Sequence, residues 1–80
     1  MRLVDVPVQV TVQAGRLLGF RWRGRTRRVV RVIDRWRYLG RWWAGEGEWR
    51  FVKVETDDGG VFELYLDVAA GQWRLYRVYD

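Results

Sequence analysis

Regular alternation of apolar and polar residues marks the start of the chain as an extended strand. Valines occupy positions 4, 6, 8, 10 and 12, and Pro7 or a polar residue stands at each position between them. This period of two predicts a β-strand whose valine face enters the core. Pro7 has no amide hydrogen to donate to a neighbouring strand, which predicts an edge strand or a bulge at that position. Ala14-Gly15 then predicts the first turn.

A tight turn is predicted after the next extended segment, Leu17 to Trp22. Gly24 can adopt the positive φ that a two-residue hairpin turn requires. With Gly24 and Arg25 as the central residues, Arg21 faces Arg28 and Trp22 faces Arg27 across the hairpin. Like charges that face each other destabilise a strand pair, and an anionic partner would relieve this repulsion.

The segment Val29 to Trp36 carries apolar residues at both helical and strand spacings. Four of the five residues from Val29 to Ile33 are β-branched, which favours a strand. After it, Tyr38 to Gly47 contains three glycines and is expected to form a loop.

Three further strands are predicted in the second half, over Trp49–Thr56, Val61–Asp67 and Trp73–Tyr79. Asp57-Asp58-Gly59-Gly60 is a strong hairpin-turn signal, and Ala69-Ala70-Gly71-Gln72 turns the chain again. We therefore expect an all-β fold over residues 1–80, in one small domain. The predicted architecture is a five- or six-stranded antiparallel meander curled into a small barrel, an SH3-like or similar roll.

The six tryptophans divide into two groups. Trp22, Trp49 and Trp73 lie within predicted strands and are expected in the core, with a weaker expectation of the same kind for Trp36. Trp42 and Trp43 are adjacent, so on an extended chain they point to opposite sides and one of them is expected to be exposed.

Composition removes most catalytic chemistry. The chain has no cysteine, histidine or serine, so it lacks thiol, imidazole and serine nucleophiles or bases, and zinc or haem ligation is not expected. Asp57 and Asp58 are assigned to a turn rather than to a metal, and Glu46 and Glu48 are treated in the same way. We expect a protein that is not an enzyme and has no cofactor or metal. The first residues do not resemble a signal peptide and no apolar run is long enough to span a membrane, so a cytoplasmic location is expected.

Positive charge is concentrated in one part of the chain. Ten arginines and one aspartate lie between Arg16 and Arg41, whereas four basic and eight acidic residues follow from Trp42 to the end. Guanidinium groups pair with phosphates or carboxylates and stack on aromatic rings, so arginines interleaved with tryptophans are typical of a nucleic-acid interface. The candidate binding residues are Arg21, Arg23, Arg25, Arg27, Arg28, Arg31, Arg35, Trp36, Arg37, Arg41, Trp42 and Trp43. An arginine-rich solvated face over a tryptophan-rich core would produce the same pattern without a ligand.

Several short motifs resemble an uncharacterised family of small bacterial domains. They are the run from Phe20 to Arg25, Arg28-Val29, Val32 to Trp36, Gly60 to Asp67 and Trp73-Arg74-Leu75, followed by Val78 and Asp80. At a position where the family usually has an aromatic residue, this chain has Arg27. The resemblance implies an encoding gene near error-prone (translesion) DNA polymerases, and hence work at damaged DNA.

Three functional hypotheses follow. The first is a basic module that binds nucleic acid, with single-stranded DNA favoured over RNA, as an accessory to DNA repair. The second is a protein-interaction module that docks an acidic segment of a polymerase or recombinase subunit. The third is self-association between the basic half of one copy and the acidic half of another.

Overall fold

The chain forms one curled antiparallel sheet. The computed structural model describes residues 1–41, 43 and 47–79, and within them seven strands are present. The strands are β1 (Arg2–Pro7), β2 (Gln9–Gln13), β3 (Arg16–Trp22), β4 (Arg25–Leu39), β5 (Glu48–Thr56), β6 (Val61–Asp67) and β7 (Gln72–Tyr79). Their order in the sheet is β1-β7-β6-β5-β4-β3-β2, so β1 and β2 are its two edges although they are consecutive in sequence.

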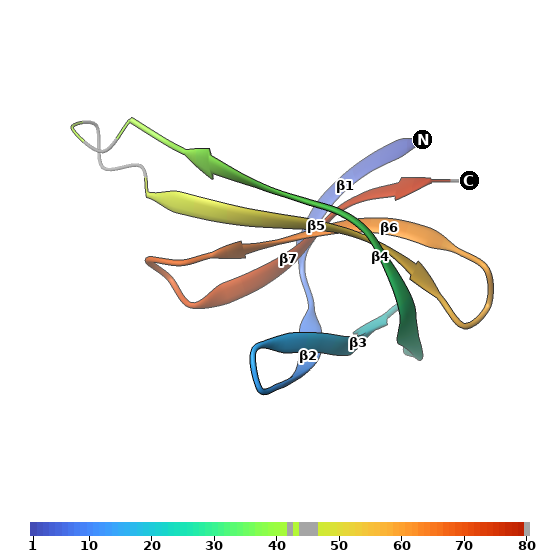
Figure 1. Cartoon of the computed structure of the whole chain (residues 1–80). Helices are drawn as coiled ribbons and strands as arrows, with labels where there is room; N and C mark the ends of the chain where they lie inside the picture. The colour runs from blue at the N-terminus through green and yellow to red at the C-terminus, as the bar shows by residue number, and fades with distance from the viewer. Residues whose placement is uncertain (42, 44–46, 80) are drawn as a thin grey trace.

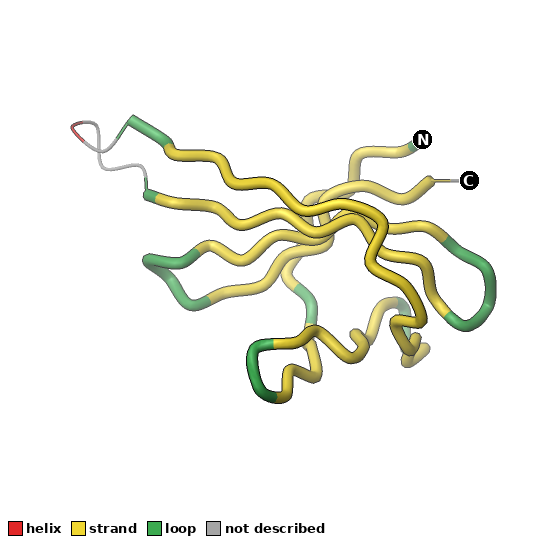
Figure 2. Tube along the Cα trace, in the orientation of Figure 1, coloured by secondary structure: helices red, strands yellow, loops and turns green. Residues whose placement is uncertain are grey.

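The sheet curls far enough to bring the β2–β3 hairpin across one face of β4–β7 (Figures 1 and 2). The result is a half-barrel, which confirms the all-β prediction. The described residues contain more strands than the five or six predicted, because the first valine-rich segment is two strands.

That division occurs at Val8. β1 pairs with β7 as far as Pro7, and β2 then pairs with β3 from Gln9 onward. The prediction of one continuous strand is therefore wrong, since the chain must leave β7 to reach the other edge of the sheet. Pro7 does lie in an edge strand, which confirms the first alternative. The predicted bulge at Pro7 is wrong, because Val6 and Pro7 pair in register with Leu75 and Arg74, and the register shift of β1 lies earlier, between Leu3 and Val6.

The valine face enters the core over most of its length. Val8 is buried, and Val4, Val6 and Val10 pack against the buried cluster. Val12, next to the last residue of β2, is exposed.

The turn between β3 and β4 differs by one residue from its predicted position. Its central residues are Arg23 and Gly24, which both have positive φ (53° and 70°), as a type I′ hairpin turn requires. Trp22 therefore faces Arg25, and Phe20 faces Arg27. The predicted facing pairs Arg21–Arg28 and Trp22–Arg27 are wrong, because a slip of one residue changes every cross-strand pair.

β4 is the longest strand, and it confirms the strand assignment of Val29 to Trp36. It continues to Leu39, so the predicted loop from Tyr38 is wrong at its start: Tyr38 and Leu39 pair with Trp49 and Glu48. Two register shifts, after Val29 and after Val32, bend β4 and allow one strand to serve both halves of the curled sheet.

The remaining strands and turns follow the prediction closely. β5 and β7 each begin one residue before the predicted start, and β6 has the predicted bounds. The Asp57–Gly60 turn is closed by two backbone hydrogen bonds, from the amide of Thr56 to the carbonyl of Gly60 and from the amide of Gly59 to the carbonyl of Thr56.

The core lies between the β2–β3 hairpin and the strands β5–β7. Its buried members are Val8, Phe20, Val52, Val54, Phe62, Leu64, Leu75 and Val78. Trp22 and Trp73 pack against this cluster but are only half-buried, as is Trp49. Trp49 lies on the opposite face of the sheet from the core, so its predicted place in the core is wrong.

Candidate nucleic-acid interface

Among the described residues, six aromatic side chains in mutual contact lie on the outer side of the sheet, away from the core. Cross-strand pairing sets Trp36 opposite Phe51 and Tyr38 opposite Trp49, while Val52 and Val54 of β5 point to the core. Because side chains alternate along a strand, residues two apart share a face. The six residues, named here the aromatic face, are Trp36, Tyr38, Trp49, Phe51, Tyr65 and Tyr76.

A register shift places the last of these rings. Glu63 pairs with Arg77 and Leu64 pairs with Leu75, which leaves Tyr76 as an extra residue in β7. Such a bulge re-aims side chains. The ring of Tyr76 consequently meets those of Phe51 and Tyr65, at centroid distances of 5.4 and 5.7 Å.

The rings form a continuous contact network across four strands. Trp36 lies parallel to Phe51, with centroids 5.3 Å apart and planes 5° apart. Tyr65 contacts Phe51 at 5.0 Å and Trp49 at 5.2 Å, and Tyr38 contacts Trp49 at 5.4 Å. These distances are typical of favourable aromatic pairs, so the rings fix one another in position.

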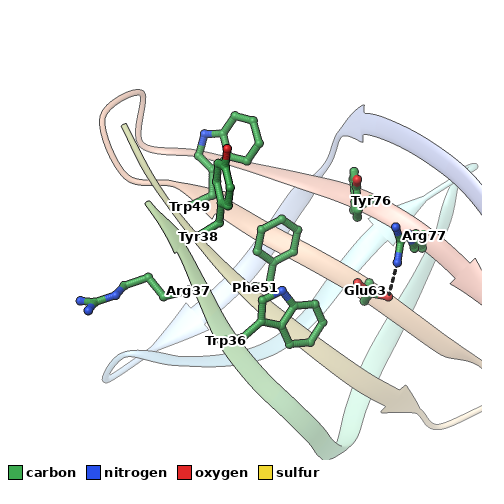
Figure 3. Close-up of a pocket in the computed structure, with 8 residues that line it drawn as sticks. All are labelled: Trp36, Arg37, Tyr38, Trp49, Phe51, Glu63, Tyr76 and Arg77. Atoms are coloured by element: carbon green, nitrogen blue, oxygen red, sulfur yellow. Dashed lines mark ion pairs between the residues drawn. The ribbon is translucent and has the colours of Figure 1, made fainter. Parts of the chain in front are cut away.

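The rings in the middle of this network are buried, and two of those at its border are exposed. Phe51 and Tyr65 are 9% and 4% exposed, whereas Trp36 and Tyr38 are 39% and 47% exposed. A shallow groove of about 390 Å³ lies between Trp36 and Tyr38 on one side and Tyr76 on the other (Figure 3). The groove is therefore lined by flat aromatic surface that solvent can reach.

One end of the groove carries a neutralised charge pair. The carboxylate of Glu63 is buried, lies 3.8 Å from the guanidinium of Arg77 and accepts a hydrogen bond from the hydroxyl of Tyr79. Arg77 also lies 4.9 Å from the ring of Tyr76. The hydrogen bond to Glu63 is the main reason that the pKa of Tyr79 is raised.

Asp5 fixes the other side of the aromatic face to the edge strand β1. The hydroxyl of Tyr65 donates to Oδ1 of Asp5 at 2.9 Å, and Arg74 donates to the same oxygen at 2.8 Å. Burial, and then the hydrogen bond to Asp5, raise the pKa of Tyr65 to about 12.

This pKa predicts a loss of stability at high pH. The folded chain holds the Tyr65 proton until about pH 12, whereas the ordinary tyrosine value is 10.0. Stabilisation from Tyr65 is thus complete below pH 10 and is expected to decline as the pH rises through about 12. Denaturant unfolding across this range should show the decline, and it should be smaller in Tyr65→Phe. Absorbance titration of the wild type and of Tyr65→Phe identifies the pKa of the tyrosine that the variant lacks. If that pKa has the ordinary tyrosine value, the raised pKa assigned to Tyr65 is contradicted.

A group of cations adjoins the aromatic face on the same outer side. Arg31 pairs with Glu55 at 2.9 Å, and Glu55 lies on the same face of β5 as Phe51. Arg28 on β4 and Arg21 on β3 are exposed and have no acidic partner among the described residues. Lys53, beside them on β5, lies 4.2 Å from the ring of Tyr79. These four residues are named the basic strip.

Other predicted arginines belong to the scaffold. Arg25 and Arg27 both lie 3.4 Å from Oδ2 of Asp58, and the side chain of Arg27 is only 13% exposed. The guanidinium of Arg27 packs 5.4 Å from the ring of Trp22, and that of Arg23 packs 4.6 Å from the same ring. These contacts tie the β3–β4 turn to the β5–β6 turn.

Arg35 and Arg37 lie on the opposite face of β4 from Trp36. Arg35 pairs across the ladder with Val52, whose side chain is in the core, and Arg37 extends away from the aromatic rings (Figure 3). Nη1 of Arg37 lies 3.9 Å from Glu48.

At the tip of the β4–β5 hairpin, Arg41 and Trp43 are exposed. Trp42 and Glu46, which the sequence analysis singled out, lie outside the described residues.

Of the predicted residues, Arg21, Arg28, Arg31 and Trp36 thus share the outer side. Sequence reasoning missed most of the aromatic face. One signal for this face was present in the sequence of β5. Trp49 and Phe51 alternate with Arg50 and Val52, so the two aromatic residues lie on the opposite face of the strand from Val52, which points to the core. No such signal exists for Tyr76, whose orientation depends on the bulge.

These features define a small all-β module with an aromatic and partly basic outer face. The chain belongs to the family described as "Domain of unknown function (DUF6504)", which matches residues 2–80. This membership confirms the expected relation to an uncharacterised family. No curated protein and no solved structure matches the chain. Within the residues that the structure describes, no helix is long and apolar enough to cross a membrane.

Proposed function

We propose that this domain binds single-stranded nucleic acid, with DNA as the preferred ligand, along its outer side. The observation that carries the proposal is the layer of six aromatic rings, which is open to solvent at Trp36 and Tyr38. Bases of a single strand stack on such rings without regard to sequence, at about 1–3 kcal/mol per base. Aromatic residues on an open sheet face serve this purpose in common RNA-binding modules.

The basic strip supplies the second component, contact with phosphates. Arg28 and Trp36 both lie on β4, and at about 3.3 Å per residue they are roughly 20–27 Å apart. A strand of nucleic acid that follows β4 therefore passes over Arg28 and Arg31, then beside Asp34, which faces Lys53 of β5, and reaches the rings of Trp36 and Tyr38. Arg21 and Lys53 flank this path on β3 and β5. Phosphate contacts of this kind set position and affinity, and they carry no sequence information.

In this proposal the domain binds and does not catalyse, and it acts in the cytoplasm as an accessory to DNA repair. The preference for DNA rests on the resemblance to domains encoded near error-prone polymerases. A docking site for an acidic protein segment is the second candidate. The composition of this face favours it, because aromatic residues and arginine are enriched at protein interfaces.

Comparison of three oligonucleotides tests the proposal. Fluorescence anisotropy should show tighter binding to a labelled single strand than to a duplex or hairpin of the same composition. The physical reason is that bases in a duplex are already stacked on one another and are not accessible to Trp36 and Tyr38. Equal affinity for single strand and duplex would show that the domain contacts phosphates alone and does not stack on bases. Absence of binding at low salt, together with retention of an acidic polymerase subunit, would favour the second candidate.

A further inference from the structure

β4 has a long edge that no other strand of the described residues covers. Only its first residues, Arg25–Arg28, pair with β3, although the strand continues to Leu39. From Val29 onward it pairs with β5 alone among the described residues. Asp34–Leu39 follow β5 without a register shift, so this part of the edge is regular. A regular unpaired edge is a template for a strand from another chain.

Two hydrogen bonds show which amides this edge presents. In an antiparallel ladder, successive residues direct their amides to opposite sides. The amide of Gly40 donates to the carbonyl of Gly47 across the hairpin, so amides of even-numbered residues near it point toward β5. The amide of Arg35 instead donates to Oδ1 of its neighbour Asp34 at 2.8 Å. Arg35, Arg37 and Leu39 therefore direct their amides to the unpaired side, and the amide of Arg35 is already hydrogen-bonded to Asp34.

A concave apolar pocket adjoins this edge on the core side of the sheet. It has a volume of about 280 Å³, and its lining includes Leu17, Val32, Val52, Leu66 and Trp73. Arg35 also lines it, is exposed and has no acidic partner among the described residues. Arg50, the other arginine there, is held by Glu48 at 2.8 Å.

We infer that the unpaired edge of β4 binds an extended acidic segment of a partner protein as an added strand. Backbone hydrogen bonds form with the amides of Arg37 and Leu39, acidic side chains lie beside Arg35 and Arg37, and an apolar side chain enters the pocket near Val32. Charge complementarity selects this occupant over a second copy of the chain. Antiparallel pairing of two β4 edges would set the arginines of one copy against those of the other, and facing like charges are destabilising.

The edge and the aromatic face share one stretch of β4, since Trp36 and Tyr38 lie between Arg35 and Leu39. The two proposals rest on different groups, the edge amides with Arg35 and the exposed rings, so either can fail without the other. The probe is a fluorescein-labelled peptide of alternating glutamate and valine, and the readout is anisotropy with the full chain. Binding in the micromolar range is expected, and Arg35→Glu should weaken it about tenfold. A peptide with lysine in place of glutamate should not bind. Failure of the acidic peptide to bind, or equal binding by Arg35→Glu and the wild type, would overturn the inference.

Strand addition is distinguished from simple charge attraction by the backbone. Arg37→Pro removes an edge amide, which a strand edge tolerates, whereas Arg37→Ala removes the same charge and keeps the amide. We expect Arg37→Pro to abolish binding and Arg37→Ala to retain most of it. Two N-methylated peptides check the result without changing the protein, one methylated at its odd-numbered amides and the other at its even-numbered amides. In an added strand only one of these two sets of amides faces β4, so only one of the two peptides should lose binding. Equal binding by the two methylated peptides would contradict the inferred occupant. A dimer of the chain that Arg37→Pro dissociates would contradict it as well.

Discussion

Replacing Asp58 by alanine is expected to lower the free energy of unfolding by about 2–4 kcal/mol. Its carboxylate accepts hydrogen bonds from the hydroxyl of Thr56 and the amide of Gly60, which together hold the β5–β6 turn. The same carboxylate lies 3.4 Å from both Arg25 and Arg27. Without it the largely buried guanidinium of Arg27 has no anion beside it, and an uncompensated buried charge is costly.

Asp57→Ala is the matched control for this change. Asp57 precedes Asp58 in the same turn, and its side chain accepts one long hydrogen bond, 3.4 Å from the amide of Arg28. Its replacement should cost less than about 1 kcal/mol in the same denaturant unfolding experiment. Equal losses in the two variants would show that the turn alone, and not the contact with Arg27, accounts for the stability. The hydrogen bond from Thr56 also lowers the pKa of Asp58, so this stabilisation should disappear as the pH falls through that lowered pKa.

Reversing Arg21, Arg28 and Arg31 to glutamate is expected to weaken binding to a single-stranded oligonucleotide by about 100-fold or more at low salt. Each of the three side chains is exposed on the outer side, so the fold should be retained. Reversal of Arg31 removes its exposed ion pair with Glu55 and sets two carboxylates opposite each other, which at this exposed position should cost about 1–2 kcal/mol of stability. Anisotropy titration at several salt concentrations measures the effect, and circular dichroism checks the fold.

A second triple variant separates location from net charge. Arg2, Arg16 and Arg50 are also exposed but lie outside the basic strip, and their reversal changes the charge of the chain by the same amount. We expect this variant to lose much less affinity. If both triple variants lose the same affinity, binding reflects overall charge and the basic strip has no special role. Arg27 is left unchanged in both variants, since its reversal would place an acid beside Asp58.

Sequence pattern predicted the fold class well because strands and glycine turns have local signatures. The period of two in β5 and β6, and the Asp57–Gly60 turn, required no knowledge of distant contacts. Register was harder, since either Arg23-Gly24 or Gly24-Arg25 satisfies the same local preference. The choice between them depends on how Phe20 and Trp22 meet the core, which is a property of the whole sheet.

The candidate site was predictable only in part, for a related physical reason. Whether an arginine is available to a ligand depends on acids that are distant in sequence. Arg27 meets Asp58 because two separate turns lie side by side in the curled sheet. Arg28, its neighbour, points to the other face and has no such partner within the described residues. Bulges cause a similar loss of information, since the added residue in β7 turns Tyr76 onto the aromatic face.

The most direct test of the central claim combines the salt dependence of binding with loss of the two exposed rings. For a single-stranded oligonucleotide, contact with about three to five phosphates predicts a slope of log affinity against log salt of about −2 to −3.5. Joint replacement of Trp36 and Tyr38 by alanine should weaken binding by about 1–3 kcal/mol per base that loses its stacking partner, with the slope unchanged because stacking releases no ions. A variant that binds as tightly as the wild type, or a wild type that does not bind at low salt, would contradict the claim that the outer face binds single strands by stacking.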